Sequence, residues 1–199
     1  MEEEIVKAAI AEFGEKGIRF TMDDLAARLR ISKRTLYEAV PSKEGVVSRA
    51  IDLVFADIKE QEREICADDR LDIVEKIKRV VCLLPRNFAA IDYDKIYEIH
   101  RFYPELYRQI EDRLAGEWET TLSLFRQAIA AGTIRPVNVH VVRQMILGTW
   151  KNFFDAPFLN AHGLTFDQAL QDMMDILFDG IVVRNPASGG ESAWRNPAK

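Results

Sequence analysis

TMDDLAARLRISKRTLYEAVPSK, residues 21–43, has the pattern of two short helices joined by a tight turn. The Thr21 hydroxyl can cap the first helix by accepting from the amide of Asp24, and Ser32 can cap the second helix in the same way. Each cap is flanked by apolar residues with the spacing of a hydrophobic staple, which fixes the angle of entry into the helix. The stretch therefore predicts a helix-turn-helix.

An amphipathic helix precedes this motif. Ile5, Ala9 and Phe13 recur every four residues, so residues 2–16 present one apolar face, and Gly17 is a natural helix stop. The three helices together predict one small trihelical unit.

The segment after the motif predicts an anion site. Pro41 ends the third helix, Ser42 caps a fourth, and Lys43 lies in the first turn of that fourth helix. Free amides at a helix N-terminus bind anions, so this end, together with Lys43, is predicted to bind phosphate. Polar side chains on the exposed face of the third helix are also compatible with phosphate: Lys33, Arg34, Thr35 and Tyr37.

Residues 5–47 resemble the DNA-binding domain of the tetracycline-repressor (TetR) family of bacterial transcription regulators. The matching residues at the family's spacing are Ile5, Ala8, Ala9, Phe13, Gly17, Thr21, Leu25, Ala26, Ser32, Thr35, Leu36, Tyr37, Ser42, Lys43 and Glu44. The resemblance implies that Thr21, Tyr37 and Lys43 hold phosphates. It also implies that Lys33, Arg34 and Thr35 approach base edges, beside the cap Ser32.

The sequence departs from the family after Tyr37, where the family usually has aromatic or basic residues and a phenylalanine. Here the residues are Glu38, Ala39 and Val40, so a negative charge is expected near phosphate. Either Glu38 is a solvated carboxylate that pairs with a neighbouring Lys or Arg, or it reads a cytosine amino group.

The net charge of the chain is −5, but the charge is unevenly distributed. Residues 19–43 carry six basic against three acidic side chains, and a local positive face is sufficient for DNA binding.

The only two cysteines, Cys66 and Cys82, have neither zinc-site nor disulfide-framework spacing, which favours a reduced cytoplasm and predicts no metal and no cofactor. No leader or membrane-spanning run is apparent, so we expect a soluble protein without a membrane partner.

The remaining sequence continues with helical periodicity and predicts an all-α protein of about nine helices. Residues 1–47 are expected to form the helix-turn-helix domain, 48–184 a larger helical effector-binding and dimerisation domain, and 185–199 a disordered tail rich in small residues. Within the second domain, residues 104–131 read as one long helix with a possible break near Gly116.

The last two predicted helices, about 138–154 and 165–183, are apolar on more than one side. A helix of this kind needs more than one partner, which favours a four-helix interface between two copies of the chain over burial within one subunit. The predicted interface residues are Val142, Ile146, Phe153, Phe166, Leu170, Met173, Leu177 and Ile181.

Aromatic residues are concentrated in the middle of the chain. They are either ordinary core residues or the lining of an apolar cavity, which the resemblance implies for a small hydrophobic or aromatic effector. The candidate pocket residues are Phe88, Tyr93, Tyr97, His100, Trp118, Phe125, Trp150 and Phe154.

The sequence therefore predicts a transcription regulator, most often a repressor in this family. It would bind a palindromic operator as a homodimer and leave it when a small molecule binds. The alternative is a helical interaction protein whose aromatic groove binds a partner helix or peptide. No nucleophile elbow, phosphate loop or metal-ligand spacing is present, so we expect no enzymatic activity and assign no catalytic residue.

Overall fold

The structure, a computed structural model, describes residues 1–86, 94–154 and 157–181. Within these ranges all regular structure is helical, which confirms the predicted all-α class. The N-terminal helices are α1 (Glu2–Lys16), the 3-10 turn η1 (Gly17–Arg19), α2 (Met22–Leu29), α3 (Lys33–Ala39) and α4 (Lys43–Ala67). The middle helices are α5 (Ile73–Val81), α6 (Asp94–Phe102), α7 (Pro104–Gly116) and α8 (Glu119–Ala130). The last are α9 (Val139–Phe154), α10 (Pro157–His162) and α11 (Phe166–Ile181).

The predicted N-caps of the first helices are present. Thr21 and Asp24 form a reciprocal capping box, with the Asp24 amide donating to the Thr21 hydroxyl over 3.2 Å. Ser32 accepts from the amide of Thr35, and Ser42 accepts from that of Gly45. The helix-turn-helix therefore follows from hydrogen bonds between residues three apart.

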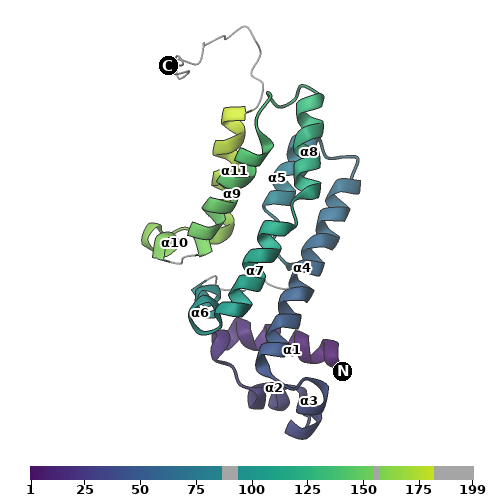
Figure 1. Cartoon of the computed structure of the whole chain (residues 1–199), viewed down its shortest axis with the longest axis vertical. Helices are drawn as coiled ribbons and strands as arrows, with labels where there is room; N and C mark the ends of the chain where they lie inside the picture. The colour runs from purple at the N-terminus through teal and green to yellow at the C-terminus, as the bar shows by residue number, and fades with distance from the viewer. Residues whose placement is uncertain (87–93, 155–156, 182–199) are drawn as a thin grey trace.

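Helix α4 connects the two ends of the molecule (Figure 1). It begins beside α2 and α3 and continues upward past α7 toward α5 and α8. Its buried residues Val46, Ile51 and Phe55 belong to the same apolar core as α1, α2 and α3, and Ile99 of α6 and Leu106 of α7 complete that core. The expected domain boundary between residues 47 and 48 thus lies inside one helix and inside one shared core.

The expected long helix over residues 104–131 is divided into α7 and α8. In a continuous helix the amide of Trp118 would donate to the Leu114 carbonyl, but here the Trp118 indole Nε1 donates to it instead, over 2.6 Å. The Trp118 side chain is buried in the core formed by α5, α8, α9 and α11. This break and the short α10 raise the helix number in the described residues above the expected nine.

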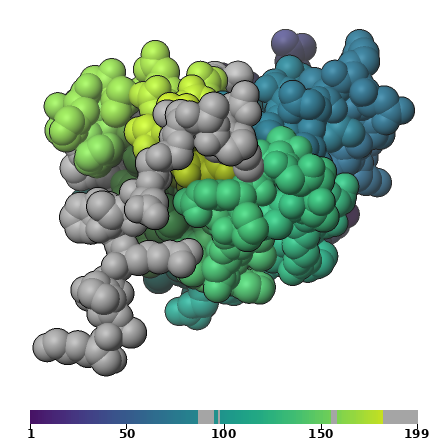
Figure 2. Space-filling view, turned by 90° about the horizontal axis from the view of Figure 1, so that it is seen from above, coloured from purple at the N-terminus to yellow at the C-terminus, as the bar shows by residue number. Residues whose placement is uncertain are grey.

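The C-terminal helices form their own side of the molecule. Seen from above, the blue α4–α5 end and the green α8 lie on one side and the yellow-green α10–α11 region lies on the other (Figure 2). None of the described helices is both long and apolar enough to cross a membrane. The predicted tail, residues 185–199, lies outside the described residues.

The predicted dimer residues require a correction. In a single subunit the structure already buries most of them: Val142, Ile146, Phe153, Phe166, Leu170 and Ile181. Met173 and Leu177 are half-buried against the same core. Both α9 and α11 are apolar on two sides, and the sequence pattern alone did not show which side faces the chain's own core.

Candidate functional site

Three of the predicted DNA-contacting side chains project from α3 into solvent. Tyr37 is 47% exposed, and Lys33 and Arg34 are also exposed. The Lys33 ammonium lies 2.6 Å from Asp23, and the Arg34 guanidinium lies 2.9 Å from Glu38. Exposed ion pairs of this kind contribute only about 0–1 kcal/mol, so both cations can exchange these partners for phosphate or base edges at little cost.

Glu38 is an exposed carboxylate that pairs with Arg34 four residues earlier on the same helix. This geometry matches the solvated alternative for Glu38. It also keeps a negative charge on the exposed face of α3, where it opposes the approach of a phosphate backbone.

The hydroxyl groups predicted to contact DNA are occupied within the chain. Thr21 Oγ1 donates to the Asp24 carboxylate over 2.7 Å while accepting from the Asp24 amide. Ser32 Oγ and Thr35 Oγ1 lie 2.8 Å apart and share a hydrogen bond. These three residues therefore hold the ends of α2 and α3 in place, whatever contact they make with DNA.

The Lys43 side chain turns inward in this structure. Its ammonium donates to the Ile18 carbonyl and lies 4.6 Å from the centre of the Phe20 ring and 5.4 Å from that of Tyr103. Burial lowers the pKa of Lys43 from its ordinary value. The cation thus connects the helix-turn-helix unit to the start of α7, a contact with a distant aromatic ring that the sequence pattern did not reveal.

A buried carboxylate fastens α1 to α2. Glu12 is 3% exposed and pairs with Arg28 over 2.6 Å and with Lys16 over 2.8 Å. Burial alone would raise the pKa of Glu12, but the hydrogen bonds from Lys16 and Arg28 outweigh burial and lower it below 4.5. Lys16 also pairs with Asp24, so α1 controls the orientation of α2 through ionic contacts.

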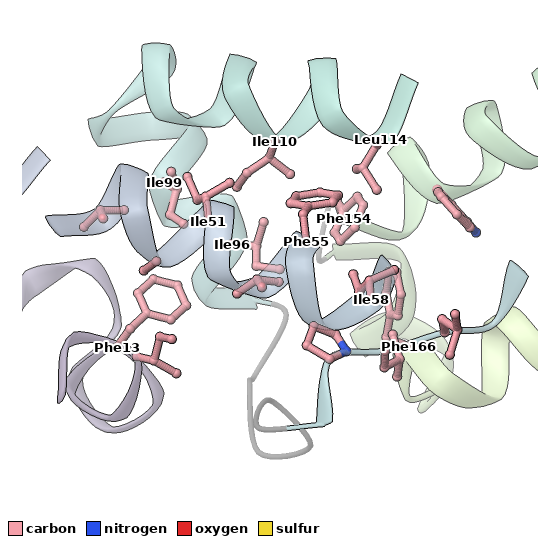
Figure 3. Close-up of a pocket in the computed structure, with 18 of the residues that line it drawn as sticks. Phe13, Ile51, Phe55, Ile58, Ile96, Ile99, Ile110, Leu114, Phe154 and Phe166 are labelled. Carbon is pink, nitrogen blue, oxygen red and sulfur yellow. The ribbon is translucent and has the colours of Figure 1, made fainter. Parts of the chain in front are cut away.

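The second feature of the site is an apolar cavity of about 150 Å³ between the N-terminal and C-terminal helices (Figure 3). Its lining comes from elements far apart in the sequence, and its side chains are aliphatic or aromatic. They are Ala9, Ile10, Phe13, Phe20, Val47, Ala50, Ile51, Val54, Phe55, Ile58, Leu83, Leu84, Pro85, Ile96, Ile99, Ile110, Leu114, Trp150, Phe154, Phe166 and Leu170.

Two of the predicted pocket residues, Trp150 and Phe154, line this cavity. Trp118 and Phe125 do not, because both are buried in the separate core of α5, α8, α9 and α11. His100 is exposed beside the Tyr107 ring and is not among the lining residues. Phe88, Tyr93 and the side chain of Tyr97 lie outside the described part of the structure.

Most of the lining was not predicted, since it is aliphatic and comes from α1, α4, α6 and α7. In the sequence, Ile51 and Phe55 look like ordinary core positions, and they do belong to the core as well as to the cavity wall. The only available signal was the length of the apolar stripe along α4.

Comparison with known proteins agrees with this geometry. Residues 5–50 match the family model described as bacterial regulatory proteins, tetR family. An HTH-type transcriptional regulator of Bacillus subtilis, YvaF, is 28% identical over 187 residues, covering 94% of this chain and 98% of YvaF.

Two solved structures share the fold. A TetR/AcrR-family transcriptional regulator of Thermobifida fusca aligns with a TM-score of 0.68 at 23% identity, covering 90% of this chain and 97% of that one. The regulator FadR of Bacillus subtilis, solved with stearoyl-CoA, aligns with a TM-score of 0.64 at 20% identity, covering 91% and 100%. Residues 5–50 thus form a helix-turn-helix domain of the tetR family of bacterial regulatory proteins, in a chain that shares its fold with solved TetR-family regulators.

Proposed function

We propose that this regulator is a repressor that binds a palindromic operator as a homodimer and is released by a small apolar effector. It acts by binding rather than by catalysis. The observation that carries the proposal is the apolar cavity, whose wall includes Phe13 and Phe20 of the helix-turn-helix unit itself. A ligand that fills this cavity contacts the DNA-binding unit directly.

The DNA-contacting face in this proposal is the exposed side of α3. Lys33 and Arg34 approach base edges, where a basic side chain reads guanine, and Tyr37 contacts the phosphate backbone. Their exposure and their weak ion pairs support these roles. Lys43 is left out of this set because its ammonium is already bonded to the Ile18 carbonyl.

The dimer surface in this proposal is the outer side of α9 and α11. Val141 and Met145, four residues apart on α9, are each 55% exposed, and Ile176 on α11 is 75% exposed. Two copies joined through these helices would present two α3 helices to successive major grooves, provided that the helices stand about 34–36 Å apart.

The nature of the effector is supported by the cavity lining. Aliphatic and aromatic walls favour an apolar molecule, because apolar surface is transferred out of water on binding. FadR of Bacillus subtilis, which shares the fold, was solved with stearoyl-CoA. That likeness supports an apolar effector for this chain.

Selection of bound sites from random duplex DNA, followed by affinity measurements at several salt concentrations, tests the proposal. We expect a palindromic site and an affinity that falls steeply as salt is raised, since phosphate contacts release counterions. A chain that binds no duplex, or binds with no salt dependence, would refute the DNA-binding function.

A further inference from the structure

The cavity is long and narrow. Its lining residues on α4 run from Val47 to Ile58 and recur every three or four residues, so they form one face of the helix. At 1.5 Å per residue this face is about 16 Å long, roughly the length of an extended chain of a dozen carbons. A volume of about 150 Å³ distributed over this length describes a narrow channel, which a thin ligand has to widen less than a fused-ring one.

The two ends of the cavity belong to different parts of the molecule. Phe13 of α1 lies at one end and Phe166 of α11 at the other, with Ile51 and Phe55 of α4 between them (Figure 3). A short ligand held at the α11 end would touch no residue of the DNA-binding unit. A ligand that spans the cavity must contact α1.

The lining also restricts the chemistry of the ligand. Among the lining residues that the structure describes, the only side-chain nitrogen or oxygen belongs to the Trp150 indole, whose buried Nε1 has no hydrogen-bond partner within the described ranges. Burying a charged or strongly polar group against the other walls would be costly. The part of the ligand inside the cavity is therefore apolar.

We infer that the regulator measures the length of an unbranched alkyl chain, and that only a chain reaching Phe13 and Ile10 on α1 releases DNA. This inference rests on the proposed function and specifies how its effector is recognised. Most ligand pockets have volumes of about 300–1,000 Å³, so a bound chain must widen this cavity. Widening at the Phe13 end displaces α1.

Displacement of α1 would reach α2 through ion pairs. Glu12 of α1 holds Arg28 over 2.6 Å, and Lys16 holds Asp24 over 2.7 Å. Because Asp24 also caps α2, a shift of α1 moves the start of the helix-turn-helix as a unit.

Helix α6 connects the same end of the cavity to α1. Ile96 and Ile99 line the cavity, while Lys95 donates to the Gly14 carbonyl over 2.5 Å. At Gly17, where φ is +64°, a β-carbon would lie 2.6 Å from the Glu98 carboxylate, so α6 packs directly on the end of α1. A chain that presses on Ile96 and Ile99 therefore acts on α1 from a second side.

The test uses the full chain, its selected duplex and straight-chain saturated acids from octanoic to hexadecanoic, with their coenzyme A thioesters as a second series. Calorimetry measures binding, and fluorescence anisotropy of the labelled duplex measures release. We expect octanoic acid to bind with less than about a twofold effect on DNA affinity, and hexadecanoic acid to weaken DNA affinity on the order of tenfold. The two series distinguish a free acid from an acyl thioester as the source of the chain.

The shape requirement has its own control. Undecanoic acid and adamantane-1-carboxylic acid have the same number of carbon atoms, but only the first is an unbranched chain. We expect the first to bind at least about tenfold more tightly, since the compact cage does not fit a narrow cavity. Equal binding of the two acids would overturn the unbranched-chain inference.

Variants at the α1 end of the cavity test whether release of DNA depends on the length of the alkyl chain. Phe13→Leu enlarges this end, so an acid that is just long enough to release wild type should still bind but no longer release DNA. Ile10→Val serves the same purpose if Phe13→Leu does not fold. Phe125→Leu, a matched truncation in the separate core, should leave the length threshold unchanged.

The outcomes separate the two proposals. If the chain binds its duplex and acids of every length release it equally, or if no acid of either series binds, the length inference is wrong while the DNA-binding function stands. If no duplex is bound at all, the proposed function fails as well. A threshold that shifts in Phe13→Leu but not in Phe125→Leu supports the inference.

Discussion

The Lys43 ammonium bonds to the Ile18 carbonyl inside the protein, whereas the family resemblance implies that it binds a phosphate. Lys43→Met keeps the apolar stem but loses the bond to the Ile18 carbonyl and the contacts with the Phe20 and Tyr103 rings. We expect the free energy of unfolding to fall by about 1–2 kcal/mol. Urea unfolding measures this change, and the salt slope of DNA binding should stay the same.

Lys33→Met is the matched control, because Lys33 is an exposed lysine that pairs with Asp23 at the surface. Its free energy of unfolding should stay close to that of wild type, because exposed ion pairs contribute little to stability. If Lys43→Met instead lowers the salt slope by about one and leaves stability intact, Lys43 binds a phosphate as the resemblance implies.

Glu12 makes the stability of the protein sensitive to acid. Its pKa in the folded protein lies below the ordinary value of 4.5, because Lys16 and Arg28 stabilise the charged form despite burial. The stabilisation is therefore fully present above pH 4.5 and is lost as the pH falls through the lower folded value. The free energy of unfolding, measured in urea at a series of pH values, should decrease in this acid range.

Glu12→Gln should be less stable than wild type by about 1–3 kcal/mol at neutral pH, because Arg28 and Lys16 lose their charged partner. Its stability should also depend less on pH below 4.5. Glu119→Gln, at a highly exposed carboxylate, is the control and should keep the wild-type pH dependence. An unchanged pH dependence in Glu12→Gln would show that other carboxylates cause the acid sensitivity.

Helix α3 contains a carboxylate, Glu38, that we expect to weaken DNA binding. Glu38 is exposed and holds Arg34 in an ion pair, so it both opposes phosphate and occupies a cation that would contact DNA. Glu38→Gln should raise the affinity for every duplex roughly two- to fivefold. Fluorescence anisotropy with selected and unrelated duplexes measures the effect.

Glu105→Gln, at an exposed carboxylate on α7, is the control for the change in net charge and should leave DNA affinity unchanged. If Glu38 reads a cytosine amino group, the Gln variant will lose affinity for the selected duplex alone and become less selective at one base pair.

How well an element could be predicted depended on the range of the interactions that define it. The starts of α2, α3 and α4 could be predicted because Thr21, Ser32 and Ser42 bond to amides only three residues away. The division of the helix over residues 104–131 was harder to place, since it depends on the burial of Trp118 against the distant α9 and on its bond to Leu114.

Part of the candidate site is formed by contacts between segments that are distant in the sequence, and that part could not be predicted from the sequence. The exposed cations Lys33 and Arg34 lie on the polar side of one helix, which periodicity identifies. The cavity arises where α1, α4, α6, α7 and the C-terminal helices meet, and only this meeting distinguishes wall residues such as Ile51 from ordinary core residues. The aromatic candidates Trp118 and Phe125 failed for the same reason, since their partners in the other core are remote in sequence.

Both α9 and α11 are apolar on two sides, so the sequence pattern did not show which side could form a dimer surface. The burial of one side in the structure leads to a prediction for the assembled protein. The inner apolar side of α9 is buried within its own subunit, which leaves Val141 and Met145 exposed. Met145→Glu places a charge where a second copy would exclude water, at a cost of several kcal/mol per dimer. We expect sedimentation velocity to show a dimer for wild type and a monomer for the variant, with Ile176→Glu behaving in the same way.

A monomer should also lose affinity for a palindromic duplex, because each α3 then binds its half-site alone. The control is Phe102→Glu, which introduces the same charge at another exposed apolar side chain, on α6. This variant should remain dimeric, and an equal loss of dimer there would mean that the charge acts without regard to position. If Met145→Glu and Ile176→Glu both stay dimeric, the two copies associate through another surface, and the spacing of the α3 helices must be set by that surface instead.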